Sequence, residues 1–226
     1  MSRLVWPFLL CVLALPALAA SPSVDPKLSA VGWKIFTFTD LKPAHFRLAE
    51  DGSIEVEAAG SVAGLYRFVV PGDERKPILT WRWRVDRADI QIVDLSHKAN
   101  ADRPVALHVG FAQDDSTGGF FRNLSASLMG MPPPGRVLSY TWGGRHQRGD
   151  SFVSPHFGEL GHVVILRPGD TPLQQWQEER VDVHADFRRF FGYEPPEIAY
   201  IVLSGDADDQ PGHTQARVAD ITLSDR

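Results

Sequence analysis

Short segments with a period of two run along most of this chain and favour β-strands over helices. Residues 53–57 read Ser-Ile-Glu-Val-Glu, so Ile54 and Val56 share one face of a strand while the two glutamates share the other. Turn dipeptides such as Asp51-Gly52 separate these segments. We expect strands at residues 33–39, 53–57, 64–70, 78–85, 105–112, 137–142, 162–167, 179–183, 198–204 and 217–223. This pattern predicts an all-β fold, a jelly roll or β-sandwich of two antiparallel sheets.

Helix-forming sequence is scarce. Residues 185–192 read Ala-Asp-Phe-Arg-Arg-Phe-Phe-Gly, which predicts one short helix that ends at Gly192 and whose phenylalanines plug an end of the sandwich. Residues 120–134 contain three consecutive prolines and are expected to form a long loop. This loop is either a functional segment or a variable surface insertion.

The first residues have the features of a secretory signal peptide. Arg3 precedes an apolar run, and Ala17-Leu18-Ala19 forms a small-x-small cleavage signal. We therefore expect a signal peptide at 1–19, a single domain at 20–226, and a periplasmic or secreted protein without a membrane span. Cys11, the one cysteine of the chain, lies in this leader, so no disulfide is expected in the mature protein. The net charge of −5 argues against nucleic acid as a partner.

Three predicted strands carry polar side chains that could form a binding face. Alternation places Trp81 and Trp83 on one face of residues 80–85 and Arg82 and Arg84 on the other. The tryptophans are expected in the core. In the following strands His108 faces the same way as two small residues, and Ser139 the same way as Thr141.

If these strands are neighbours, their polar face is a concave floor for a ligand. Arginine side chains suit carboxylates and hydroxyl groups, so the expected partner is a glycan or another polar small molecule. A solvent-exposed face without a ligand is the alternative. The expected ligand-binding residues are Arg82, Arg84, Asp102, His108, Tyr140, Thr141, Asp206 and Asp208.

The acidic segment Ser-Gly-Asp-Ala-Asp-Asp-Gln-Pro-Gly-His at 204–213 raises the question of a cation. Pro211 and Arg217 stand where an EF-hand loop needs glycine and glutamate, which excludes that loop. A looser structural Ca²⁺ site made by Asp206, Asp208 and Asp220 stays open, as does an ordinary solvated turn. No other cofactor is expected.

No motif identifies catalytic residues, because the chain contains neither a phosphate-binding glycine loop nor HExxH. One alternative to a binding protein is a polysaccharide hydrolase or lyase, with His108 or Tyr140 as base, an aspartate of the acidic segment as acid, and Arg82 neutralising a substrate carboxylate. Another is a structural or adaptor protein of the cell envelope that contacts its partner through the loop at 120–134.

Several segments, in order, resemble the bacterial family called domain of unknown function 3047. They are Leu-Thr-Trp-Arg-Trp-Arg-Val at 79–85, Leu-Ser-Tyr-Thr-Trp-Gly at 138–143, Trp176 through Gly192, and the matching positions Asp206, Asp208, Ala216, Asp220 and Ile221. The resemblance spans roughly residues 30–224 and implies an exported β-sandwich similar to carbohydrate-binding modules, without implying an activity. Ala106 stands where the family tends to have an arginine, which would alter any function of that side chain.

Overall fold

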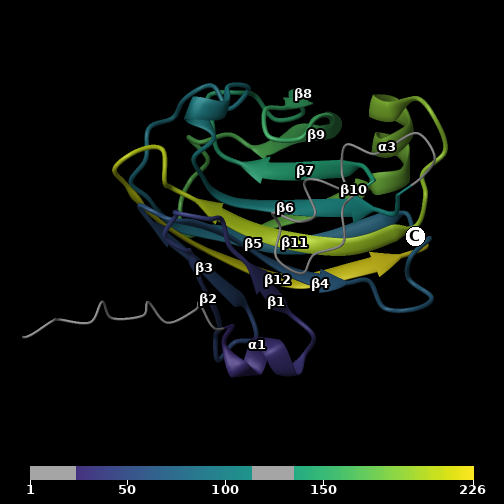
Figure 1. The fold of residues 1–226 in the computed structure, drawn as a ribbon, viewed down its shortest axis with the longest axis horizontal. Helices are drawn as coiled ribbons and strands as arrows, with labels where there is room; N and C mark the ends of the chain where they lie inside the picture. Colours follow the sequence, from purple (N-terminus) through teal and green to yellow (C-terminus); the bar gives the residue numbers. More distant parts are fainter. Residues whose placement is uncertain (1–23, 114–134) are drawn as a thin grey trace, which may run out of the picture.

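Two β-sheets packed face to face form the protein (Figure 1). The computed structural model describes residues 24–113 and 135–226, so the predicted signal peptide and the loop at 120–134 lie outside the described residues. The larger sheet has the order β1-β4-β11-β6-β7-β9-β8 and the smaller one β10-β5-β12-β3-β2. The prediction of an all-β sandwich is therefore confirmed.

The bounds of the strands agree with the alternating segments of the sequence. The seven-stranded sheet contains β1 (Lys34–Phe36), β4 (Val62–Phe68), β6 (Arg103–Phe111), β7 (Val137–Trp142), β8 (Ser151–Ser154), β9 (Gly158–Arg167) and β11 (Ile198–Asp206). The five-stranded sheet contains β2 (His45–Leu48), β3 (Ile54–Ala59), β5 (Ile78–Ala88), β10 (Gln177–Asp182) and β12 (His213–Ser224). Neighbouring strands run antiparallel except β7 and β9, which are parallel. The sequence missed β2 and β8, which are only four residues long and too short to show a period.

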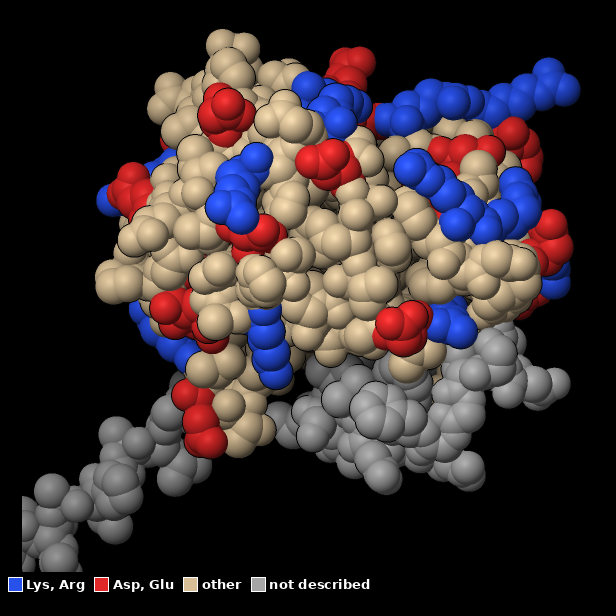
Figure 2. Space-filling view, turned by 90° about the horizontal axis from the view of Figure 1, so that it is seen from above, with Lys and Arg blue, Asp and Glu red and all other residues tan. Residues whose placement is uncertain are grey.

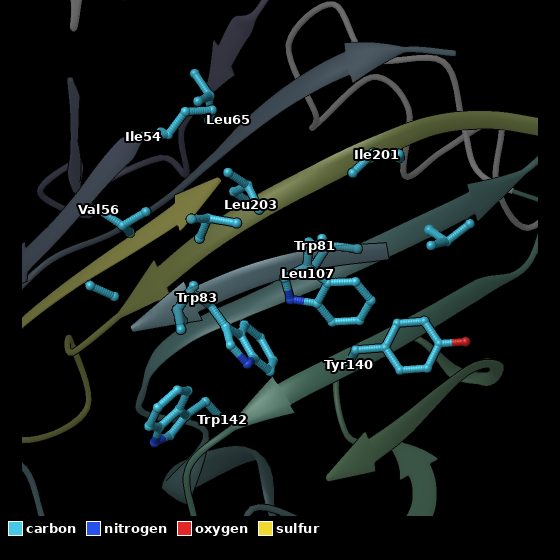
Figure 3. Close-up of a cluster of buried hydrophobic side chains, with 14 of the residues drawn as sticks. Ile54, Val56, Leu65, Trp81, Trp83, Leu107, Tyr140, Trp142, Ile201 and Leu203 are labelled. Atoms are coloured by element: carbon cyan, nitrogen blue, oxygen red, sulfur yellow. The ribbon is translucent and has the colours of Figure 1, made fainter. Parts of the chain in front are cut away.

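Aromatic side chains from the facing sheets fill the core (Figure 3). Trp81 and Trp83 of β5 are buried, as predicted, and meet residues of β7 across the sandwich. The ring centroids of Trp83 and Trp142 lie 5.8 Å apart, and those of Trp81 and Tyr140 lie 5.7 Å apart. Such tilted and edge-on pairs add to the hydrophobic stabilisation from burial.

A buried carboxylate joins the two sheets beside this core. Glu179 of β10 is 4% exposed and accepts hydrogen bonds from Trp83 Nε1 at 3.1 Å and Arg148 Nη2 at 2.9 Å. It also accepts one from Arg167 Nε of β9, which belongs to the other sheet. The charge is thus paired, as a buried carboxylate must be.

The helices are short. α1 (Pro26–Ala30) and a 3₁₀ turn at Lys98–Asn100 precede the helix α3 (Val183–Phe191), which begins after Asp182 and ends at Gly192 with φ 81°. Phe187 of α3 is fully buried against the core, so the predicted role of this helix as a plug is confirmed. None of the helices in the described parts of the chain is both long and apolar enough to cross a membrane.

Acidic and basic side chains lie side by side on the face seen from above (Figure 2). Several basic side chains gather at the upper right of this view, with acidic side chains among them (Figure 2).

Candidate functional site

The outer face of the seven-stranded sheet carries a pocket of about 710 Å³. Alternation along β6 explains its floor, because Leu107 and Val109 point into the core while Ala106 and His108 point outward. Strand pairing then sets His108 beside Ser139 of β7. The volume lies in the range typical of small-molecule sites.

His108 is held at the centre of this floor by two serines. Its Nδ1 lies 2.8 Å from Oγ of Ser139, and its Nε2 lies 2.8 Å from Oγ of Ser204. Burial lowers the pKa of His108 to about 3, and the nearby positive charge of Arg103 and the neighbouring His156 act in the same direction. The imidazole is therefore neutral at physiological pH, donating to one serine and accepting from the other. Thr141 lies in the next row of the same floor.

The carboxyl groups of Asp102, Asp206 and Asp208 form an acidic corner at one end of the pocket. Asp206 is 4% exposed, and its Oδ2 accepts a hydrogen bond from Arg103 Nη1 at 3.0 Å. Its Oδ1 is buried without a hydrogen-bond partner in the described part of the chain. Burial raises the pKa of Asp206 to about 8; Arg103 opposes this, and the carboxyl groups of Asp208 and Asp102 add to it. Asp206 is therefore a proton-bearing group near neutral pH.

Asp102 stabilises the backbone of the acidic segment that follows β11. Its two carboxylate oxygens accept the backbone N–H groups of Asp209 at 3.1 Å and Gln210 at 2.9 Å. It is buried and does not line the pocket. Asp102 is therefore placed to position Asp208 rather than to touch a ligand.

The segment that follows β8 also lines the pocket. His156 and Phe157 lie there. Burial lowers the pKa of His156 to about 4, helped by the charges of Arg103 and Lys98. This second imidazole is also neutral at physiological pH, so it too can donate and accept hydrogen bonds.

The predicted grouping of Arg82 and Arg84 with His108 is wrong. Both arginines lie on β5 in the five-stranded sheet, on the opposite face of the sandwich. Arg82 Nε lies 2.6 Å from a carboxylate oxygen of Asp220, and both guanidinium groups lie over the ring of Trp176, at 4.5 and 5.2 Å. Alternation correctly separated them from the tryptophans, but it does not determine which strand lies next to β5.

Tyr140 is also misplaced as a ligand-binding residue. It points into the core and is fully buried, and its hydroxyl donates to Asp186 of α3 at 2.8 Å. Its neighbours Ser139 and Thr141 face the pocket instead, because successive side chains of β7 alternate.

The predicted cation set needs one correction. Oxygens of Asp102, Asp206 and Asp208 come within 4.8 Å of one another, whereas Asp220 pairs with Arg82 on the other sheet. Both oxygens of Asp102 already accept backbone N–H groups, and Oδ2 of Asp206 already accepts a hydrogen bond from Arg103. Calcium binding at this corner stays a prediction from the sequence.

Sequence reasoning missed Ser204, His156 and Arg103. Side-chain alternation along β11, residues 198–206, puts Ser204 on the same face as Asp206. Applying this rule to that strand would therefore have identified Ser204. Arg103 could not be found in this way. A register shift between Ser204 and Asp206 in the β11–β6 pair brings Arg103 opposite Asp206, and such irregularities break the simple period.

Comparison with known proteins identifies a family. The model of the family described as "Protein of unknown function (DUF3047)" matches residues 31–222. No curated protein matches this chain.

Several solved structures are similar at low identity. A family 11 carbohydrate-binding module from the cellulase Lic26A-Cel5E of Clostridium thermocellum is 11% identical, with a TM-score of 0.40, over 85% of this chain and 87% of that one. The xyloglucanase domain of NopAA from Sinorhizobium fredii is 10% identical, with a TM-score of 0.46, over 86% and 94%. Endoglucanase cel12A from Rhodothermus marinus is 10% identical, with a TM-score of 0.44, over 85% and 91%.

Proposed function

The chain belongs to the DUF3047 family, which is described as having unknown function, and from the pocket of this member we propose that the protein binds a hydroxyl-rich ligand, such as a glycan, on its seven-stranded sheet. The observation that carries the proposal is the buried row Ser204–His108–Ser139 on the pocket floor. Hydroxyl groups and neutral imidazoles both donate and accept hydrogen bonds, which matches the needs of sugar hydroxyls. The predicted signal peptide at 1–19 would place this binding in the periplasm or outside the cell.

Replacing His108 by alanine tests the proposal. The variant is expected to bind about 10- to 100-fold more weakly to the best glycan of an array, because both serines lose the ring that orients them and a ligand-facing polar group is removed. The measurement is the dissociation constant by calorimetry, after circular dichroism has shown that the variant is folded.

His45→Ala is the matched control. His45 lies on β2 of the other sheet and is exposed, so its removal should leave the affinity unchanged. Equal binding by folded His108→Ala and wild-type protein would contradict the proposal.

Glycoside hydrolysis is a second candidate, favoured by Asp206, a buried acid at the end of the pocket whose raised pKa lets it hold a proton near neutral pH. Asp206, with its pKa raised by burial to about 8, would donate a proton to the leaving oxygen, and Asp208 would act on the sugar carbon. His108, Tyr140 and Arg82 do not assemble into the alternative catalytic set expected from the sequence, because they point to three different environments.

Hydrolysis predicts the release of shorter sugars from a panel of oligosaccharides. Asp206→Asn is expected to lower the rate by at least about 100-fold while binding persists, since the amide cannot donate the proton to the leaving group. Asp220→Asn, on the other sheet, is the control. Full turnover by both Asp206→Asn and Asp208→Asn would exclude this mechanism.

A further inference from the structure

The polarity of the pocket changes along the strands that form its floor. Strand pairing across β11, β6 and β7 arranges the outward residues in rows. At one end the row consists of Tyr200, Gly110 and Val137. This row offers the ligand an aromatic ring and an aliphatic side chain, with a glycine between them over which the Tyr200 ring packs.

Polar groups begin in the next rows and end in the acidic corner. His108 and Ser139 share a row with Val202, then Ser204 and Thr141 flank the small side chain of Ala106. The last pair is Asp206 with Arg103. These rows therefore lead from an apolar end, through hydroxyl groups, to a charged end.

Apolar side chains also line the two sides of the pocket, beside the rows of His108 and Ser204. Phe36 and Phe38 line one wall and Val163 and Phe157 the other. Phe38 remains 39% exposed. An apolar segment of the ligand that packed against these walls would remove them from water.

We propose that the ligand is amphipathic, with a hydroxylated head at the His108–Ser204 rows and a hydrocarbon chain or ring system over the row of Tyr200 and Val137. This inference rests on the proposed function, since the head is the hydroxyl-rich group already assigned to the floor. The chemical class is that of a glycolipid or alkyl glycoside.

A series of alkyl glucosides that share one head and differ in chain length tests the inference. Methyl, butyl, hexyl and octyl β-glucosides are titrated into the wild-type protein by calorimetry, each below its aggregation concentration. Affinity is expected to rise by about two- to fourfold with each added methylene until the pocket is filled, so that octyl glucoside binds at least about 100-fold more tightly than methyl glucoside.

The substitution Val137→Thr tests where the alkyl chain of the ligand lies within the pocket. The change keeps the shape of the side chain and adds a hydroxyl to the apolar row, so octyl glucoside should lose about tenfold in affinity while methyl glucoside is unaffected. Val153→Thr on β8 is the matched control, because Val153 is 43% exposed and does not line the pocket. A loss for octyl glucoside in Val137→Thr alone supports the inference.

The outcomes separate this inference from the proposed function. Equal affinity for all chain lengths, or binding of oligosaccharides but of no alkyl glucoside, would overturn the amphipathic ligand and leave glycan binding standing. No binding of any glucoside or oligosaccharide would overturn both. A chain-length dependence that persists unchanged in folded Val137→Thr would overturn the placement of the chain over this row.

Discussion

Replacing Glu179 by alanine is expected to lower the free energy of unfolding by about 3–5 kcal/mol. Glu179 is buried between the sheets and accepts hydrogen bonds from Trp83, Arg148 and Arg167. Without the carboxylate, the buried indole N–H loses its acceptor and Arg167, whose side chain is 20% exposed, loses its counter-charge. Urea unfolding followed by tryptophan fluorescence measures the change.

Glu178→Ala provides the control for Glu179. Glu178 is the preceding residue of the same edge strand, but its side chain is exposed, so the substitution should change the free energy of unfolding by less than about 0.5 kcal/mol. If the two variants lost the same stability, the carboxylate would not be an important link between the sheets.

Asp206→Asn is expected to exceed the wild-type protein in stability by several kcal/mol at pH 8.5 and to equal it near pH 4. The pKa of Asp206 is raised to about 8 in the folded protein, mainly by burial, from its usual value of 3.8. A raised carboxyl pKa means that the folded state holds the proton more tightly than the unfolded state does. The wild type therefore loses this stabilisation as the pH rises from about 4 to about 8, whereas asparagine resembles the protonated acid at every pH.

The histidines of the pocket change the stability of the fold with pH in the opposite direction. The pKa of His108 is lowered to about 3 and that of His156 to about 4, so the unfolded state gains protons first as the pH falls below the usual histidine value of 6.5. Stability is then lost toward low pH. The difference between Asp206→Asn and the wild type isolates Asp206, because both proteins contain the same histidines.

Unfolding free energies of both proteins between pH 4 and 8.5 provide the measurement. Asp220→Asn is the control, since the Asp220 side chain is 70% exposed. Parallel curves for Asp206→Asn and wild type would show that Asp206 is not a buried, proton-bearing acid. This result would also remove the basis for its role as a proton donor.

Much of the fold could be predicted from local patterns. The expected strands, the helix ended by Gly192 and the burial of Trp81 and Trp83 all depend on a few neighbouring residues. Within a strand, side chains alternate because of the pleat alone, whatever lies beside it. For the same reason the sequence placed His108 and Thr141 on polar faces of their strands, and in the structure both residues line the pocket.

Only the tertiary structure decided which of these faces meet. The sequence put Arg82 next to His108, but β5 pairs with β10 and β12, and its arginines lie across the sandwich from the pocket. Asp102 and Arg103 join Asp206 although about a hundred residues separate them in the chain, and an irregularity in strand pairing completes that contact. The faces of a strand are set by the local geometry of its own backbone, whereas its neighbours are chosen by burial and hydrogen bonding over the whole chain. The acidic segment could therefore be recognised in the sequence, and its place at the end of an amphipathic pocket could be learned only from the folded protein.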